Sequence, residues 1–276
     1  MKLLTLVLGT GRELSAKATL YVLAAISTLI LLGAAVTLSS TTTAEGTTLL
    51  LFGNPAGPPS TPEAFSGLVS QMESAFAGGL FFGVVLFGMF ATAGVLPEAL
   101  ERGTVDLYLS KPIARWELLA GKYLGSVLAI FVNIIYFIGF LWIIVGLRVG
   151  IWNTNLLLAG LMMTFAFACL FSIVSLLGVF TRNMAISIIV GFVYLFVISQ
   201  ILQSREQGLF HLSTNEIYRG VLDGLYYVFP QIPAMQVNVL KLVAGNGIEW
   251  QPFLQSFLSS GGILALSAWV LKRKDF

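Results

Sequence analysis

Residues 123–147 read YLGSVLAIFVNIIYFIGFLWIIVGL, a run of 25 positions without a single Asp, Glu, Lys or Arg. A helix needs about 20 consecutive apolar residues to cross a hydrocarbon core roughly 30 Å thick. A run of this length and apolarity therefore predicts a transmembrane helix. The same criterion, applied to the rest of the chain, decides the fold class.

The composition of the 276-residue chain agrees with a membrane location. Hydrophobic residues make up 57% of it, charged residues only 10%, and the mean hydropathy is +0.90. Soluble domains usually carry about 25% charged residues. A chain as apolar as this one would expose large apolar patches in water. The net charge of +2 comes from dispersed basic residues, which predicts no nucleic-acid partner. Cys169 and His211 are the only residues of their types, which excludes a disulfide framework and a metal site of several Cys or His ligands.

Six charge-free windows are long and apolar enough to cross a bilayer. They predict spans at about residues 18–39, 75–97, 118–146, 155–180, 184–203 and 252–271. Two other charge-free windows, 46–62 and 224–240, contain prolines that would leave backbone groups unsatisfied in lipid. The sequence predicts an all-α, polytopic membrane protein that forms one domain over residues 1–276, with interfacial amphipathic helices. The glycine pairs at GxxxG spacing, Gly79/Gly83 and Gly121/Gly125, are suited to close helix packing.

The Lys and Arg residues are distributed unevenly between the two sides of such a bundle. With the N-terminus inside, eleven of the 15 fall in inside segments and four in outside segments. This positive-inside bias predicts that both termini are cytoplasmic. Residues 1–17 begin like a signal peptide, but their apolar core has only six residues before Arg12 and Glu13, against the usual 7–15 or so. We expect a short helix lying along the membrane surface, with signal cleavage as the alternative.

Two outside segments of some size follow from this topology, residues 40–74 and 205–250. The second half of the first predicts a helix with Thr61 as N-cap and Pro62 at the first helical position. The second predicts two amphipathic helices, one from the capping-box pair Ser213 and Glu216 to Pro230 and another over residues 234–244, both at the outer membrane boundary. They either cap the bundle or form an outer gate, for which the candidate residues are Tyr226, Tyr227 and Pro230.

The cytoplasmic connection between the second and third spans, residues 96–122, is unusually rich in charge. It reads LPEALERGTVDLYLSKPIARWELLAGK and holds eight of the 28 charged residues in 27 positions. Gly103 can end one helix, Thr104 can cap a short next one, and Pro112 limits that helix and opens the third span. Apolar side chains ringed by charges suit the docking of a cytoplasmic partner, and an ordinary interfacial hairpin is the alternative.

This segment resembles the coupling-helix signature of type-two ABC exporter permeases. The residues that carry the resemblance lie within 98–117: Glu98, the pair Gly103-Thr104, the run LSKPI (109–113) and Arg115. The six spans and the late YYVFP motif (226–230) extend the likeness. The overall pattern is nearest the branch that contains the permeases of nitrous-oxide-reductase maturation and gliding motility. The resemblance implies that these residues contact an ATPase: Glu98, Glu101, Arg102, Gly103, Thr104, Asp106, Leu107, Leu109, Lys111, Pro112 and Arg115.

The resemblance also implies the partners. Two permease subunits, expected as a homodimer in a prokaryotic plasma (inner) membrane, would pair above two ATP-binding-cassette subunits that hold ATP and Mg²⁺. This chain is expected to bind no cofactor, because it lacks a G-x-x-x-x-G-K-[ST] loop. The spans carry no catalytic constellation and no charged residues of the kind that ion-driven transporters keep, so we expect a transport subunit rather than an enzyme. The alternative is an ATPase-coupled mechanical or anchoring subunit that acts on an outside partner protein. The sequence does not identify the transported molecule.

Overall fold

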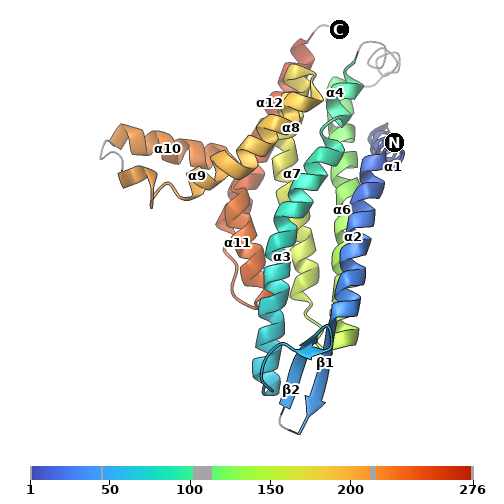
Figure 1. The fold of residues 1–276 in the computed structure, drawn as a ribbon. Coiled ribbons are helices and arrows are strands. Elements are labelled where there is room, and N and C mark those ends of the chain that lie inside the picture. The colour runs from blue at the N-terminus through green and yellow to red at the C-terminus, as the bar shows by residue number, and fades with distance from the viewer. Residues whose placement is uncertain (1, 45, 102–113, 212–215, 275–276) are drawn as a thin grey trace.

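The computed structural model describes residues 2–44, 46–101, 114–211 and 216–274. It is a bundle of long helices with a small sheet at one end (Figure 1). Among these residues, six helical stretches are long and apolar enough to cross a membrane. They are α2 (Ala18–Thr37), α3 with α4 (Pro62–Thr92, Val95–Ala99), α6 (Arg115–Val149), α7 (Asn155–Thr181), the run of α8, η1 and α9 (Met184–Val193, Tyr194–Ile198, Ser199–Gln203) and α12 (Gln251–Arg273). The predicted all-α fold with six spans is confirmed.

Both chain termini lie at one end of the bundle, which we call the terminal end, and the sheet lies at the other, the hairpin end (Figure 1). The short helix expected at the N-terminus is present as α1 (Lys2–Ser15), and it packs against the start of α6. Which end faces the cytoplasm stays a prediction from the Lys and Arg distribution.

Helix α7 forms the centre of the bundle, in contact with α3, α6, α8, α11 and α12. Its Phe167 and Phe171 rings are buried and stack on each other at 5.6 Å, and Tyr123 of α6 continues the stack at 5.5 Å. Hydrogen bonds also join the spans: Ser27 of α2 donates to Asn133 of α6 at 3.4 Å, and the Tyr123 hydroxyl of α6 donates to the Ala168 oxygen of α7 at 2.7 Å. Since lipid gives little hydrophobic drive between helices, such packing and occasional hydrogen bonds hold the spans together.

The first outside segment combines a predicted element with an unpredicted one. Thr61 caps α3 as expected, because its hydroxyl accepts from the Ala64 amide at 3.4 Å with Pro62 in the first turn. However, α3 runs without a break from Pro62 through the expected boundary at residues 74 and 75. The preceding residues form an antiparallel sheet of β1 (Leu38–Thr43), β2 (Gly46–Leu51) and β3 (Asn54–Pro55). Gly46 has φ 138°, and a Cβ there would lie 2.7 Å from the Ser60 backbone oxygen, so the turn requires glycine.

The second outside segment contains both predicted helices, α10 (Glu216–Val228) and α11 (Ile232–Val243), after the short η2 (Leu209–His211). Whether they lie at the membrane boundary stays a prediction, but α11 packs inside the bundle rather than on its surface. Figure 1 shows α10 projecting sideways from the bundle, whereas α11 runs along it. Eight of the twelve α11 residues are buried, and the helix packs on α3 and α7. Its apolar stripe therefore meets protein rather than lipid headgroups. Ser213, half of the predicted capping box, lies outside the described residues.

Candidate functional site

Residues 98–117, which we call the coupling segment after the predicted ATPase contact, are described only at their two ends. Of the eleven residues expected there, the structure describes Glu98, Glu101 and Arg115. The remaining eight lie outside the described residues: Arg102, Gly103, Thr104, Asp106, Leu107, Leu109, Lys111 and Pro112. Glu98 belongs to α4, Glu101 follows it as an exposed residue, and Arg115 begins α6. The two ends can therefore be followed into the bundle.

Arg115 joins the end of the coupling segment to the last helix of the chain. Its Nη1 donates to the backbone oxygens of Leu271, Lys272 and Lys274 at 3.1, 3.2 and 2.5 Å. The last carbonyls of a helix have no partners within the helix and carry partial negative charge, so a guanidinium is well suited to them. Lys274 in turn donates to the Val179 and Phe180 oxygens at the end of α7, both at 2.7 Å. Three helices are thus joined at the terminal end.

The other end of the coupling segment is tied to the N-terminal helices. The ammonium of Lys17, between α1 and α2, contacts both Glu98 carboxylate oxygens at 2.5 and 2.7 Å. On the neighbouring helix, Glu13 of α1 pairs with Lys122 of α6, whose side chain is only 2% exposed. Burying a lysine without an anion would be costly, so Glu13 compensates the charge of Lys122.

The glycine pair Gly121/Gly125 makes the close approach of α1 to α6. A Cβ at Gly121 would lie 2.5 Å from Leu6 Cβ, and one at Gly125 would lie 2.6 Å from Thr10 Cβ. This confirms the close packing expected of that pair. The pair Gly79/Gly83 behaves differently, since a Cβ at either position meets nothing within 4 Å among the described residues.

The candidate outer-gate residues surround the break between α10 and α11. Here the chain leaves the helix over residues 229–231, and backbone groups at this break, including the last carbonyl of α10, are met by side chains from other helices. The Pro230 oxygen accepts from the Tyr194 hydroxyl, and the Val228 oxygen from Ser259. The Gln231 amide donates to Ser256 Oγ at 2.8 Å. Irregular backbone at membrane depth is tolerated only where protein satisfies it in this way.

Tyr226 and Tyr227 lie on α10 beside a polar pocket of about 350 Å³. Arg205 stacks on the Tyr226 ring at 3.7 Å and donates to Asp223 at 2.7 Å, which holds α10 to the end of α9. Burial alone would lower the pKa of Arg205, but the hydrogen bond and charge of Asp223 raise it overall. Burial raises the pKa of the Tyr226 phenol more than Arg205 lowers it, so Tyr226 is a neutral side chain at physiological pH. Tyr227 is half exposed.

The sequence model that describes the ABC-2 family transporter proteins matches residues 56–276, well over half of the chain. The chain belongs to this family. No curated protein matches it significantly. ABC-2 permeases are membrane transport subunits that normally work with an ATP-binding-cassette ATPase, and the matched region includes all of the coupling segment and the α10–α11 break.

Several polar residues of this ABC-2 permease that the sequence did not single out help to build these sites. Tyr194 lies in the π-helical turn η1, and only the fold brings its hydroxyl to Pro230. Glu73 of α3 is 2% exposed and accepts from Asn153 at 2.7 Å, while Asn153 also donates to the Val243 oxygen at 3.0 Å. The sequence offers little signal for such residues: Tyr194 is a polar aromatic within an apolar window, and Glu73 lies at the edge of one. Among the described residues, no cluster of three or more His, Cys, Asp or Glu side chains could hold a metal ion.

Proposed function

We propose that this chain is the membrane-spanning subunit of an ATP-driven exporter in a prokaryotic plasma (inner) membrane. Two copies pair, and separate ATPase subunits that hold ATP and Mg²⁺ bind at the terminal end, which faces the cytoplasm. Residues 98–117 form the ATPase contact. We place the protein nearest the branch of nitrous-oxide-reductase maturation and gliding-motility permeases, on the resemblance of its coupling segment.

The observation that carries this proposal is the set of polar ties at the two ends of the coupling segment. One end reaches α2 through Lys17 and Glu98, and the other reaches α12 through Arg115. A displacement of the segment by a closing ATPase would therefore act on spans from both ends of the sequence. Coupling between distant sites requires such an element that moves as a unit between two positions.

The proposal is tested in the purified complex. The chain should bring down an ATPase, and nucleotide should change the thiol-labelling rate of a Tyr227→Cys variant near the outer side. The native Cys169 is 2% exposed, so its background labelling should be small. Leu107→Ala or Asp106→Ala should abolish the nucleotide-dependent change while ATP hydrolysis continues. Leu29→Ala, on the exposed face of α2, is the matched control and should leave the change intact. Nucleotide-dependent labelling without any ATPase present would refute the proposal.

A second candidate function is a mechanical or anchoring subunit that acts on an outside partner protein. It is favoured by α10, which projects sideways from the bundle (Figure 1). Its C-terminal half contacts Arg205 and, on α12, Gln255 and Ser259. A photo-crosslinker at Tyr227 that captures an outside protein, with no solute moved by the reconstituted complex, would favour this candidate. Transport without such a partner would favour the exporter.

A further inference from the structure

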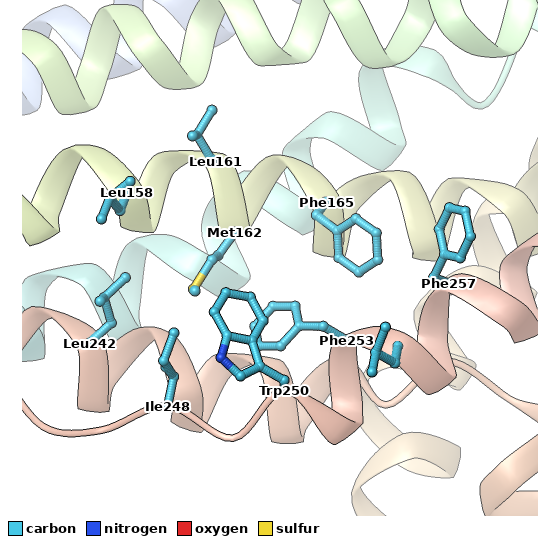
Figure 2. A pocket seen from close by; sticks show the side chains of 10 residues that line it. Leu158, Leu161, Met162, Phe165, Leu242, Ile248, Trp250, Phe253 and Phe257 are labelled. Atoms are coloured by element: carbon cyan, nitrogen blue, oxygen red, sulfur yellow. The ribbon is translucent and has the colours of Figure 1, made fainter.

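A groove on the flank of the bundle is built entirely from apolar side chains. It has a volume of about 510 Å³ and lies between α7, the end of α11, the following turn and the first half of α12. Its lining is Leu158, Leu161, Met162, Phe165, Leu242, Ile248, Trp250, Phe253, Leu254 and Phe257. The indole nitrogen of Trp250 is the only nitrogen or oxygen among these side chains. Figure 2 shows Met162 and Phe165 directed toward the segment that carries Trp250 and Phe253.

The groove has a buried floor and an exposed rim. Phe253 and Leu242 of the floor are each 8% exposed, and the Phe165 and Phe253 rings lie 6.0 Å apart. On the rim, Leu158, Leu254 and Phe257 remain about half to two-thirds exposed. The groove is therefore open to the medium around the bundle, and its floor is fixed by packed side chains.

The position of the groove along the bundle determines whether lipid or water surrounds it. Counted along α7 at 1.5 Å per residue, Phe165 and Leu158 lie about 24 and 34 Å from Thr181 at the terminal end. Along α12, Phe257 and Trp250 lie about 21 and 32 Å from Leu271. A hydrocarbon core about 30 Å thick that begins at Thr181 and Leu271 thus covers most of the groove, in the leaflet away from the terminal end. Trp250 then lies near the far interface, where tryptophan is enriched.

Water is a poor occupant of this groove. A buried water needs two to four polar partners, and the lining offers one indole N–H. A lipid chain needs none, and it is the most abundant apolar molecule at this depth. We infer that the groove holds one hydrocarbon chain of a bilayer lipid, with the lipid head beside Trp250. The inference does not depend on the proposed coupling to an ATPase.

The preference for this site should be modest. A lipid chain leaves other hydrocarbon when it enters the groove, so the gain comes from packing against the aromatic floor rather than from the hydrophobic effect. We expect a several-fold enrichment over ordinary lipid-facing surface.

Quenching of Trp250 fluorescence by lipids with brominated acyl chains tests this inference in the full-length protein. The protein is reconstituted with phosphatidylcholine containing increasing fractions of its chain-brominated form. The Trp250 signal is the difference between the intact protein and Trp250→Phe. The difference for Trp269→Phe serves as the reference, because Trp269 is half exposed on the same helix outside the groove. Half-maximal quenching of Trp250 is expected at a brominated fraction at least about threefold lower than for Trp269.

Two further variants separate a specific site from general lipid contact. Leu158→Phe with Leu254→Phe narrows the mouth and should bring Trp250 quenching to the Trp269 level. Leu29→Phe with Leu128→Phe, at exposed positions away from the groove, is the matched control and should change nothing. Parallel quenching of the two tryptophans in the intact protein would overturn the inference in favour of ordinary lipid surface. A Trp250 that no brominated lipid quenches would overturn it in favour of coverage by protein, such as a second copy.

Discussion

Replacing Gly125 by alanine should detach α1 from α6. The new Cβ would lie 2.6 Å from Thr10 Cβ and 2.9 Å from the Val7 backbone oxygen. Neither neighbour is the end of a flexible side chain, so the helices must separate. Overpacking of this kind typically costs about 1–3 kcal/mol. Alanine also gains up to about 1 kcal/mol over glycine in a helix interior, which partly offsets the cost.

Gly139→Ala on the same helix isolates the packing cost, because a Cβ there meets nothing within 4 Å among the described residues. Both variants gain the same helix propensity, so their difference should be about 1–3 kcal/mol. At roughly 2–4 °C per kcal/mol, Gly125→Ala should unfold about 2–12 °C below Gly139→Ala in a thermal scan of purified protein.

A local probe distinguishes detachment of α1 from general destabilisation. Leu14 of α1 is fully buried, so a Leu14→Cys thiol should react slowly with a maleimide in the parent protein. Adding Gly125→Ala should raise that rate several-fold, and adding Gly139→Ala should not. Equal melting temperatures and equal labelling rates for the two variants would refute the close approach of α1 to α6.

Three other substitutions test the polar contacts. Tyr194→Phe removes the donor to the Pro230 oxygen and should cost about 1–3 kcal/mol in thermal unfolding, whereas Tyr21→Phe on the exposed face of α2 should cost nothing measurable. Asn153→Ala should destabilise by a similar amount because it removes the hydrogen bond to the buried Glu73, and Glu73→Gln, which can keep that contact, should cost clearly less; the reverse order would contradict the role of Asn153. Arg205→Lys loses the planar guanidinium that stacks on Tyr226 and binds Asp223. Protease cleavage near α10 should therefore accelerate several-fold. Lys241→Ala, which breaks an exposed ion pair, should leave the cleavage rate unchanged.

The spans were predictable because lipid imposes a simple rule on sequence. A segment such as 123–147 must satisfy its own backbone and carry few charges, and both requirements are visible in the residues. The start of α3, with Thr61 as N-cap and Pro62 in the first turn, was equally predictable, because a helix cap depends on neighbouring positions in the sequence. The position of α11 was not predictable from the same kind of signal. An apolar stripe shows that a helix buries one face but does not show whether lipid or protein covers it.

The polar contacts escaped prediction for a related reason. Tyr194 and Pro230 are 36 positions apart, and Arg115 meets Leu271 across 156. No periodicity or motif links such pairs, because they are created by the packing of whole helices. The hairpin of β1 and β2 was not predicted, although its β-branched threonines favour strands.

The break between α10 and α11, over residues 229–231, has a consequence for biosynthesis. Two of the side chains that satisfy it, Ser256 and Ser259, belong to α12, which follows α10 and α11 in the chain and is therefore synthesised after them. Until α12 has entered the membrane, the Val228 oxygen and the Gln231 amide lack these partners. The region from α10 to α11 therefore acquires its final shape only after α12 has been synthesised and inserted. A chain truncated before α12 would present an unfinished surface that membrane proteases could recognise.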